Sequence, residues 1–327
     1  MQKTRIFLWD NLRFVLILFV VVGHFLTQYL SSPEFKSLWI FIYSFHMPLF
    51  VFVSGAFHKN TKITHKVTTY IAMGVIYKIV VFISRTMVGH QPKFELFTEG
   101  GAPWYMFAMA VFVLLTYLLR NMDLRYVLVI WIIIACFAGY DKDINQFLSL
   151  SRFIVFYPFY LMGVLSNKEA LLNWSKKKGI KFIALIVIGI WFALCFVLCE
   201  EFWPLNSLFA GENPFNERFY EYGFLWRLLC FAISTILCYA FILATPTKRL
   251  PVISKAGTRT LQIYFWHRPP LYFIKEFGVT ATLCATTEGK FIYLLIAIAM
   301  TFFFALKPFS FPTEQIMKYR PNKTEEK

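Results

Sequence analysis

Charged residues are scarce in this chain. Asp, Glu, Lys and Arg make up 16% of its 327 residues, against roughly 25% in soluble globular domains. Hydrophobic residues make up 58% and aromatic residues 20%. The core of a water-soluble domain cannot bury that much apolar surface, so the composition excludes an ordinary soluble enzyme and predicts that lipid surrounds most of the chain.

Acidic residues are the scarcest of the charged ones, with 18 Asp and Glu against 33 Lys and Arg and a net charge of +15. Such an excess can indicate a nucleic-acid partner. However, 21 of the 33 basic residues fall in the two terminal segments and in alternate connections between apolar stretches, as expected if those segments are cytoplasmic. We therefore expect contacts with anionic membrane lipid and no nucleic-acid partner.

Disulfide and metal motifs are also lacking. Five of the six cysteines fall inside apolar stretches, and only Cys284 lies in a predicted outer loop, which excludes an exported disulfide pair. The sequence has no metal-type cysteine spacing, no histidine pair at i and i+4 and no HExxH motif. We expect no bound metal.

What the sequence has in abundance is apolar windows of about 20 residues, the length that spans a bilayer. We predict an all-α polytopic membrane protein with about ten transmembrane helices and both termini in the cytoplasm. The first window is too long for a cleaved signal peptide. We expect one transmembrane domain over residues 1–310 and a basic, polar cytoplasmic tail over 311–327. The predicted spans are about 8–29, 38–57, 67–88, 103–119, 126–139, 153–166, 180–199, 224–244, 260–275 and 290–306.

Four polar side chains share one face of the first predicted span. Asp10, Arg13, His24 and Gln28 fall within a stripe roughly 60° wide at about 100° per residue. Arg13 and His24 lie about 16 Å apart along the axis, so one helix can contact both ends of a long ligand. Two simpler interpretations remain: an ion pair between Asp10 and Arg13, and a neutral His24 buried against another helix. Gly23 leaves room beside His24 for a substrate.

Two more histidines fall inside predicted spans. His46 lies beside Pro48 in the segment Phe45–Gly55, and His267 precedes two prolines in the segment Tyr264–Pro270. Prolines at these places can open the helix. Nothing in the sequence brings the three histidines together as metal ligands. An imidazole suits a general base that takes a proton from an attacking hydroxyl, and His24 is the first candidate for that role.

Other candidate site residues are a lysine in the middle of a span and residues near the outer ends of spans. Lys78 is hard to explain as a structural residue. Arg152, like Arg85 and Arg227, is either an interfacial anchor or a ligand. Trp104, in the segment Pro103–Met106, either belongs to an aromatic belt or lines a site. The outer connection over 200–223 combines aromatic residues, carboxylates and amides, which suits either sugar binding or an interfacial belt.

Together these segments resemble the membrane acyltransferase 3 family, in particular its fucose 4-O-acetylase-like branch. The resemblance covers most of residues 5–306 and rests on five segments in the family's order. These are Trp9–His24, Phe45–Gly55, Pro103–Met106, Ser151–Gly163 and Tyr264–Pro269.

The resemblance implies transfer of an acyl group from cytoplasmic acyl-CoA, usually acetyl-CoA, to a hydroxyl of a saccharide or lipid-linked glycan at or beyond a bacterial cytoplasmic membrane. It also implies that His24 is catalytic and that Arg13 is its partner. The sequence departs from the family in lacking the basic R-x-x-R pair after the second span. Lys62, His65 and Lys66 are the nearest substitutes, so Arg13, Lys62 and Lys66 are the predicted donor-binding residues.

The sequence therefore predicts a membrane-embedded O-acetyltransferase with His24 as its general base. Its remaining candidate lining residues are Asp10, Gln28, His46, Lys78, Trp104, Arg152 and His267. A transporter or flippase for a saccharide or lipid precursor is the main alternative, with the polar stripe lining a pathway. A membrane sensor or scaffold is a third. The sequence is compatible with a homo-oligomer.

Overall fold

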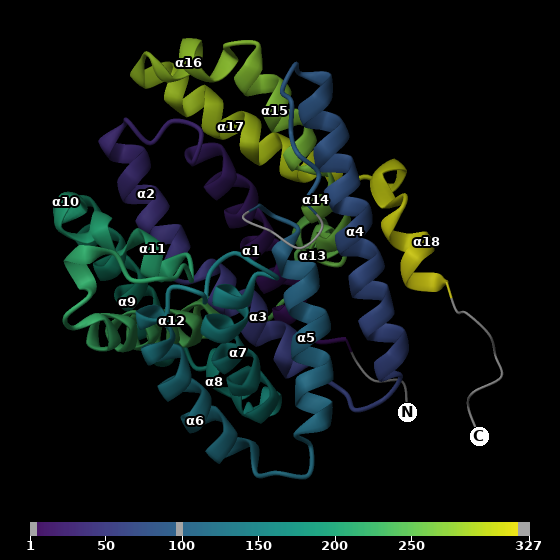
Figure 1. The fold of residues 1–327 in the computed structure, drawn as a ribbon, viewed down its shortest axis with the longest axis vertical. Helices are drawn as coiled ribbons and strands as arrows, with labels where there is room; N and C mark the ends of the chain where they lie inside the picture. The colour runs from purple at the N-terminus through teal and green to yellow at the C-terminus, as the bar shows by residue number, and fades with distance from the viewer. Residues whose placement is uncertain (1–4, 96–100, 320–327) are drawn as a thin grey trace.

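The structure is a computed structural model that describes residues 5–95 and 101–319. Its regular secondary structure in those residues is entirely helical, as predicted (Figure 1). Six stretches are long and apolar enough to cross a membrane, which confirms the prediction of a multi-pass membrane protein. They are α1 (Phe7–Leu26), α2 with α3 (Pro33–Ala56), α4 (Ile63–Met87), α9 (Lys178–Val197), α12 (Gly223–Ala244) and α17 (Thr287–Phe304).

The remaining elements are shorter. Three of them are apolar helices that match predicted spans: α5 (Trp104–Leu118), α6 (Leu124–Phe137) and α7 (Leu150–Leu165). The count of ten spans and the side of each terminus stay predictions. The other helices are α8 (Lys168–Ser175), α10 (Cys199–Phe202), α11 (Asn206–Phe209), α13 (Pro251–Gly257), α14 (Thr260–Trp266), α15 (Arg268–Glu276), α16 (Val279–Cys284) and α18 (Thr313–Lys318). The 3₁₀ turns are Ala138–Tyr140, Trp203–Leu205, Glu217–Phe219 and Lys307–Ser310.

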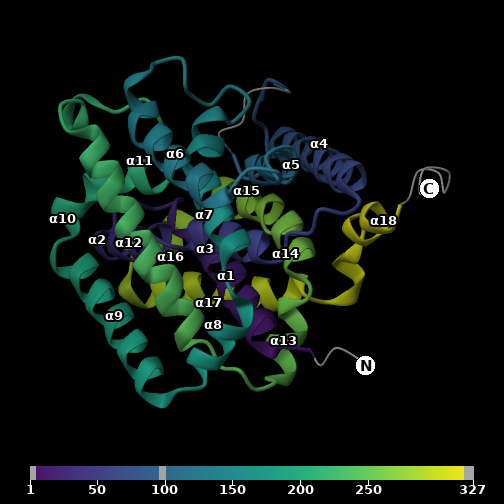
Figure 2. The same ribbon diagram turned by 90° about the horizontal axis from the view of Figure 1, so that it is seen from below.

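Helix α1 lies at the centre of the molecule in both views (Figures 1 and 2). Most of its residues are buried, and it packs against α13, α17, α2, α14 and α3. Helix α9 lies at the edge and buries little of its apolar surface against the rest of the protein. A peripheral helix of this kind suits contact with lipid. The polar stripe is thus carried by a helix that is mostly buried inside the bundle.

Prolines break two of the predicted spans. The span around 38–57 divides into α2 (Pro33–Tyr43) and α3 (His46–Ala56), because the ring of Pro48 cannot follow a regular turn against the carbonyl of Ser44, four residues earlier. That carbonyl instead accepts a hydrogen bond of 2.5 Å from Ser234 Oγ. Likewise, the continuous span predicted over 260–275 consists of two short helices, α14 and α15, which meet at His267 just before Pro269 and Pro270.

Helices α3 and α7 cross with their backbones almost in contact. A Cβ atom on Gly163 would lie 2.0 Å from the Phe52 carbonyl oxygen, and one on Gly55 would lie 2.1 Å from the Tyr160 carbonyl oxygen. Only glycine fits at such a crossing, and small residues allow this close packing of membrane helices. The crossing fixes α3, and with it His46 and Ser54, against the rest of the bundle.

The connection between α9 and α12 is folded onto the bundle. The guanidinium of Arg227 is buried and donates hydrogen bonds to the Leu208 carbonyl (2.8 Å), the Glu212 carbonyl (2.8 Å) and Asn213 Oδ1 (2.7 Å). Arg227 is therefore not an interfacial anchor that extends to water. The rings of Phe209, Phe215 and Phe219 are also buried, so they are not available to stack on a sugar.

Candidate functional site

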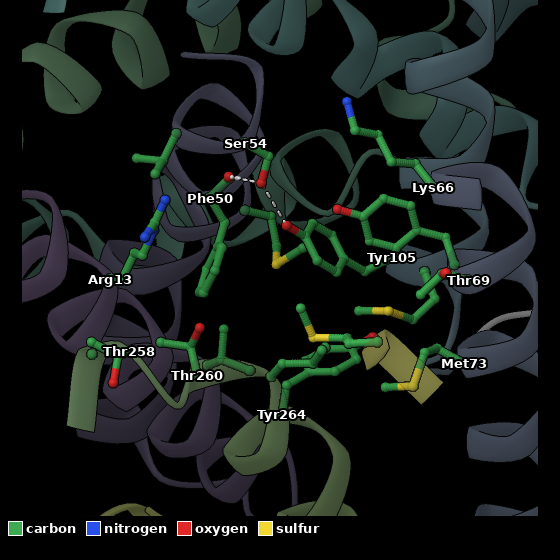
Figure 3. A pocket seen from close by; sticks show the side chains of 18 of the residues that line it. Arg13, Phe50, Ser54, Lys66, Thr69, Met73, Tyr105, Thr258, Thr260 and Tyr264 are labelled. Carbon is green, nitrogen blue, oxygen red and sulfur yellow. Dashed lines mark hydrogen bonds between the residues drawn. The ribbon is translucent and has the colours of Figure 1, made fainter. Parts of the chain in front are cut away.

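A cavity of about 410 Å³ opens beside the N-terminal half of α1, between α1, α3, α4, α5 and α14. Figure 3 shows that Arg13 and Lys66 lie on opposite sides of the cavity and that Tyr264 lies at its lower edge in this view. Its lining mixes a few polar groups with flexible apolar ones. The polar residues include Arg13, Ser54, His65, Lys66, Thr69, Tyr70, Tyr105, Thr258, Thr260 and Tyr264. The methionines are Met47, Met73, Met106 and Met317.

Arg13 is the charged residue that α1 presents to this cavity. Its guanidinium carbon lies 4.6 Å from the centre of the Phe57 ring, and its Nη1 lies 3.9 Å from Asp10 Oδ1. Asp10 itself is buried and pairs more closely with Arg5, whose Nε donates to Asp10 Oδ2 over 2.6 Å. Asp10 thus acts as a counter-ion behind the cavity wall, while Arg13 keeps hydrogen-bonding capacity for a ligand.

The two lysines predicted to bind the donor differ in position. Lys66 lines the cavity, and its ammonium donates to the Lys59 carbonyl over 2.6 Å. Lys62 is the N-cap residue of α4, with a φ of 55°, and does not line the cavity. His65 does. The first turn of α4 therefore presents His65 and Lys66 to the space that Arg13 faces.

His24 lies one turn beyond the cavity along α1. Val20 lines the cavity, and a residue four positions later lies on the same face about 6 Å further along the axis. The imidazole of His24 stacks on that of His267, with ring centres 5.1 Å apart and planes 26° apart. The fold thus brings together two histidines that are 243 positions apart in the sequence.

The hydrogen bonds of His267 define its tautomer. Its Nδ1 lies 2.7 Å from the Tyr264 carbonyl oxygen, and because a carbonyl only accepts, Nδ1 carries the hydrogen. Its Nε2 then holds a lone pair, which is buried and has no hydrogen-bond partner among the described residues. A buried acceptor without a partner is costly, so this atom is a place for a ligand hydroxyl to bind.

His46 belongs to the neighbouring helix α3. It is buried, donates from Nδ1 to the Ile42 carbonyl over 2.8 Å and packs edge-on against the Tyr43 ring. Among the described residues, no group of three or more His, Cys, Asp or Glu is placed to hold a metal ion.

Three other predicted lining residues, Arg152, Gln28 and Lys78, have partners of their own outside the cavity. The guanidinium of Arg152 lies 5.4 Å from the centre of the Trp104 ring and donates to Glu212 Oε1 over 3.4 Å. Gln28 donates to the His24 carbonyl over 3.2 Å and so caps the end of α1. Lys78 is buried in α4 with its ammonium 5.9 Å from the Phe107 ring centre, and it does not line the cavity.

Sequence reasoning missed several residues that the fold brings to this region. Ser54 and Tyr105 are neighbours in the cavity wall and hydrogen-bond through their hydroxyls, with the two oxygens 2.9 Å apart (Figure 3). Tyr264 donates from its hydroxyl to the Ala102 carbonyl and forms a wall of the cavity. Arg268, at the start of α15, places Nη1 3.3 Å from His24 Nδ1. Arg268 was detectable, since it is a charged residue inside a predicted span.

The C-terminal segment also contributes to the site, although it was predicted to be a tail. Residues Thr313–Lys318 form α18, which packs against α4 and α14, and Met317 lines the cavity. The Nε1 of Trp266 donates to the carbonyls of Phe309 (3.1 Å) and Phe311 (2.9 Å) and holds the approach to α18 in place. Residues 320–327 of the predicted tail lie outside the described residues.

Comparisons with known proteins show the family of this chain. A family model described as an acyltransferase domain matches residues 7–307. The nodulation protein NolL of Mesorhizobium japonicum (strain LMG 29417 / CECT 9101 / MAFF 303099) is 25% identical over 295 residues, which cover 78% of this chain and 74% of that protein. No solved structure matches.

Proposed function

Because this chain belongs to the acyltransferase family whose domain covers its residues 7–307, we propose that it is a membrane-embedded O-acetyltransferase that uses acetyl-CoA. The observation that carries this proposal is the arrangement along α1. Arg13 and Lys66 face one cavity, Val20 lines it further along, and His24 with His267 follows one turn later. A long donor with an anionic end and a reactive end fits such a path.

The donor's phosphates would bind at the end of the cavity that holds Arg13 and Lys66. A guanidinium and an ammonium suit phosphate oxygens, and charge-assisted hydrogen bonds of this kind are stronger than neutral ones. The connection before α4 is rich in lysine, which by the positive-inside rule supports a cytoplasmic position for this end of the cavity. The pantetheine arm would then extend past the four methionines, whose flexible side chains adapt to an elongated ligand.

The chemistry would take place at His24, beside the His267 ring that stacks on it. His24 takes the proton from an acceptor hydroxyl as its oxygen attacks the thioester carbonyl. The unpartnered Nε2 of His267 is placed to accept a hydrogen bond that orients that hydroxyl or the donor. In this proposal His24 transfers the proton and His267 positions the substrate.

The acceptor would be a hydroxyl of a saccharide or lipid-linked glycan that reaches His24 from the outer side. The paired Arg152 and Glu212 offer polar groups to sugar hydroxyls. The buried Trp104 ring is stacked on Phe156 and lies beside the Arg152 guanidinium, so it supports Arg152 and is not itself a face for a sugar. The five sequence segments support a place in the fucose 4-O-acetylase-like branch. The curated relative is a bacterial nodulation protein, which supports a bacterial cytoplasmic membrane as the location.

The test is acetyl-CoA turnover by purified, detergent-solubilised protein offered a panel of glycans. We expect His24→Ala to lower acceptor-dependent CoA release by about 10²–10⁴-fold, the usual contribution of a general base. The variant should keep the wild-type thermal unfolding midpoint. His90→Ala, at an exposed histidine after α4, is the matched control and should match the wild type. Glycan transport without consumption of acetyl-CoA would instead favour the transporter alternative.

A further inference from the structure

Arg268 contacts His24 directly. It is the first residue of α15, and its Nη1 lies 3.3 Å from His24 Nδ1. Its Nη2 donates to the Tyr272 hydroxyl over 3.3 Å, and its guanidinium carbon lies 5.3 Å from the centre of the Tyr272 ring. Tyr272, one turn further along α15, therefore holds the guanidinium toward α1.

Among the described arginines inside the bundle, Arg268 is set apart because its guanidinium has neither a carboxylate partner nor a full set of oxygen acceptors. In the described part of the chain, Arg5 and Arg13 share Asp10, and Arg152 has Glu212. Arg227 has three oxygen acceptors. No described carboxylate pairs with Arg268, and its Nε–H is buried without a hydrogen-bond partner. An uncompensated guanidinium inside a membrane bundle costs several kcal/mol, so its position favours a role toward a negative charge that appears during function.

The contact with Arg268 also limits the ability of His24 to act as a base. A guanidinium only donates hydrogen bonds, so His24 Nδ1 must be the acceptor of this one. Its lone pair is therefore occupied while Arg268 points at it. A carbonyl oxygen beside His24 that gains negative charge during the attack would offer the same N–H a stronger acceptor, and the shift of the N–H would free Nδ1 to take a proton.

We propose that Arg268 is the oxyanion-stabilising residue of the acetyl transfer, an inference that rests on the proposed function. When the acceptor oxygen attacks the thioester carbon, His24 takes its proton, the new C–O bond forms, and the carbonyl electron pair moves to the oxygen. Arg268 donates hydrogen bonds to that oxyanion. The C–S bond then breaks, the carbonyl re-forms, and the CoA sulfur leaves as the thiol with the proton from His24.

The test compares Arg268→Gln and Arg268→Lys with the wild type in the turnover assay. Loss of one oxyanion donor lowers kcat by about 10²–10³-fold, and we expect that loss for Arg268→Gln. The KM for acetyl-CoA should change by less than about threefold, because the interaction strengthens only in the transition state. Arg268→Lys keeps a charged donor, so its kcat should lie between the kcat of Arg268→Gln and that of the wild type. Arg85→Gln, at an exposed arginine of α4, should match the wild type.

The outcomes separate this inference from the proposed function. Turnover by Arg268→Gln within about threefold of the wild type would overturn the role of Arg268 and leave the O-acetyltransferase standing. A higher KM with an unchanged kcat would also overturn it, because Arg268 would then bind substrate only. A wild-type protein that consumes no acetyl-CoA would overturn both. If Arg268→Gln does not fold, a tenfold loss of kcat in folded Arg268→Lys supports the role, and a wild-type kcat contradicts it.

Discussion

At the residue scale, the polar stripe of α1 divides into groups with different partners. Asp10 turns to Arg5 and away from the cavity, Arg13 faces the cavity, and His24 meets His267 beyond it. Between the first two, Asn11 donates to the Pro246 and Lys248 carbonyls (2.8 and 2.9 Å). It also accepts a hydrogen bond of 2.6 Å from Ser254 Oγ. This one helix thus holds a counter-ion in Asp10, a structural tie in Asn11, the proposed ligand contact in Arg13 and the proposed base in His24.

Because Arg13 and Lys66 face the cavity, we expect both to contribute to binding of the donor. Arg13→Ala and Lys66→Ala should each raise the KM for acetyl-CoA about tenfold or more, since a hydrogen bond to a charged group contributes about 1.5–3 kcal/mol. Steady-state kinetics at saturating acceptor measures this. Lys176→Ala, at an exposed lysine between α8 and α9, is the control for loss of one positive charge. A KM that is unchanged in both cavity variants would contradict the proposed donor site.

At the element scale, the close crossing of α3 and α7 positions one side of the site. Gly163→Ala places a Cβ against the backbone carbonyl of Phe52, and because backbone cannot rotate away, the helices must separate. We expect a loss of about 1–3 kcal/mol, as for other overpacked sites, measured as a lower thermal unfolding midpoint in detergent. Gly189→Ala in α9 adds a methyl group where no atom lies within 4 Å, and it should not lower that midpoint. Equal midpoints for the two variants would show that the crossing is looser than described.

Much at this scale could be predicted from the sequence because it depends on local chemistry. Apolar windows located the long helices, since only their length and composition matter. Pro48, Pro269 and Pro270 indicated the breaks, since a proline prevents a regular turn wherever it lies. The contacts between α14, α15 and α1 could not be predicted, because they depend on how distant helices pack. His267 and Arg268 were therefore visible as polar residues in a span but not as neighbours of His24.

At the scale of the whole molecule, the proposed reaction needs one continuous route along α1 from Arg13 to His24. The charged residues at its beginning and the histidines at its end belong to helices from both ends of the sequence, with α3, α4 and α5 on one side and α14 and α15 on the other. Helix α18 adds Met317 to the wall. The family match over residues 7–307 is consistent with a site that needs almost the whole chain to form.

The most direct measurement of this route is acetyl transfer by Val20→Trp, which fills the cavity between Arg13 and His24 and changes neither of them. We predict a loss of turnover of at least about 100-fold, with binding of adenosine 3′,5′-bisphosphate, the nucleotide part of CoA, at the wild-type affinity. Val20→Ala, which widens the same place, should keep turnover within a few-fold of the wild type. Wild-type turnover by folded Val20→Trp would contradict the account, because the donor would then reach His24 by another path.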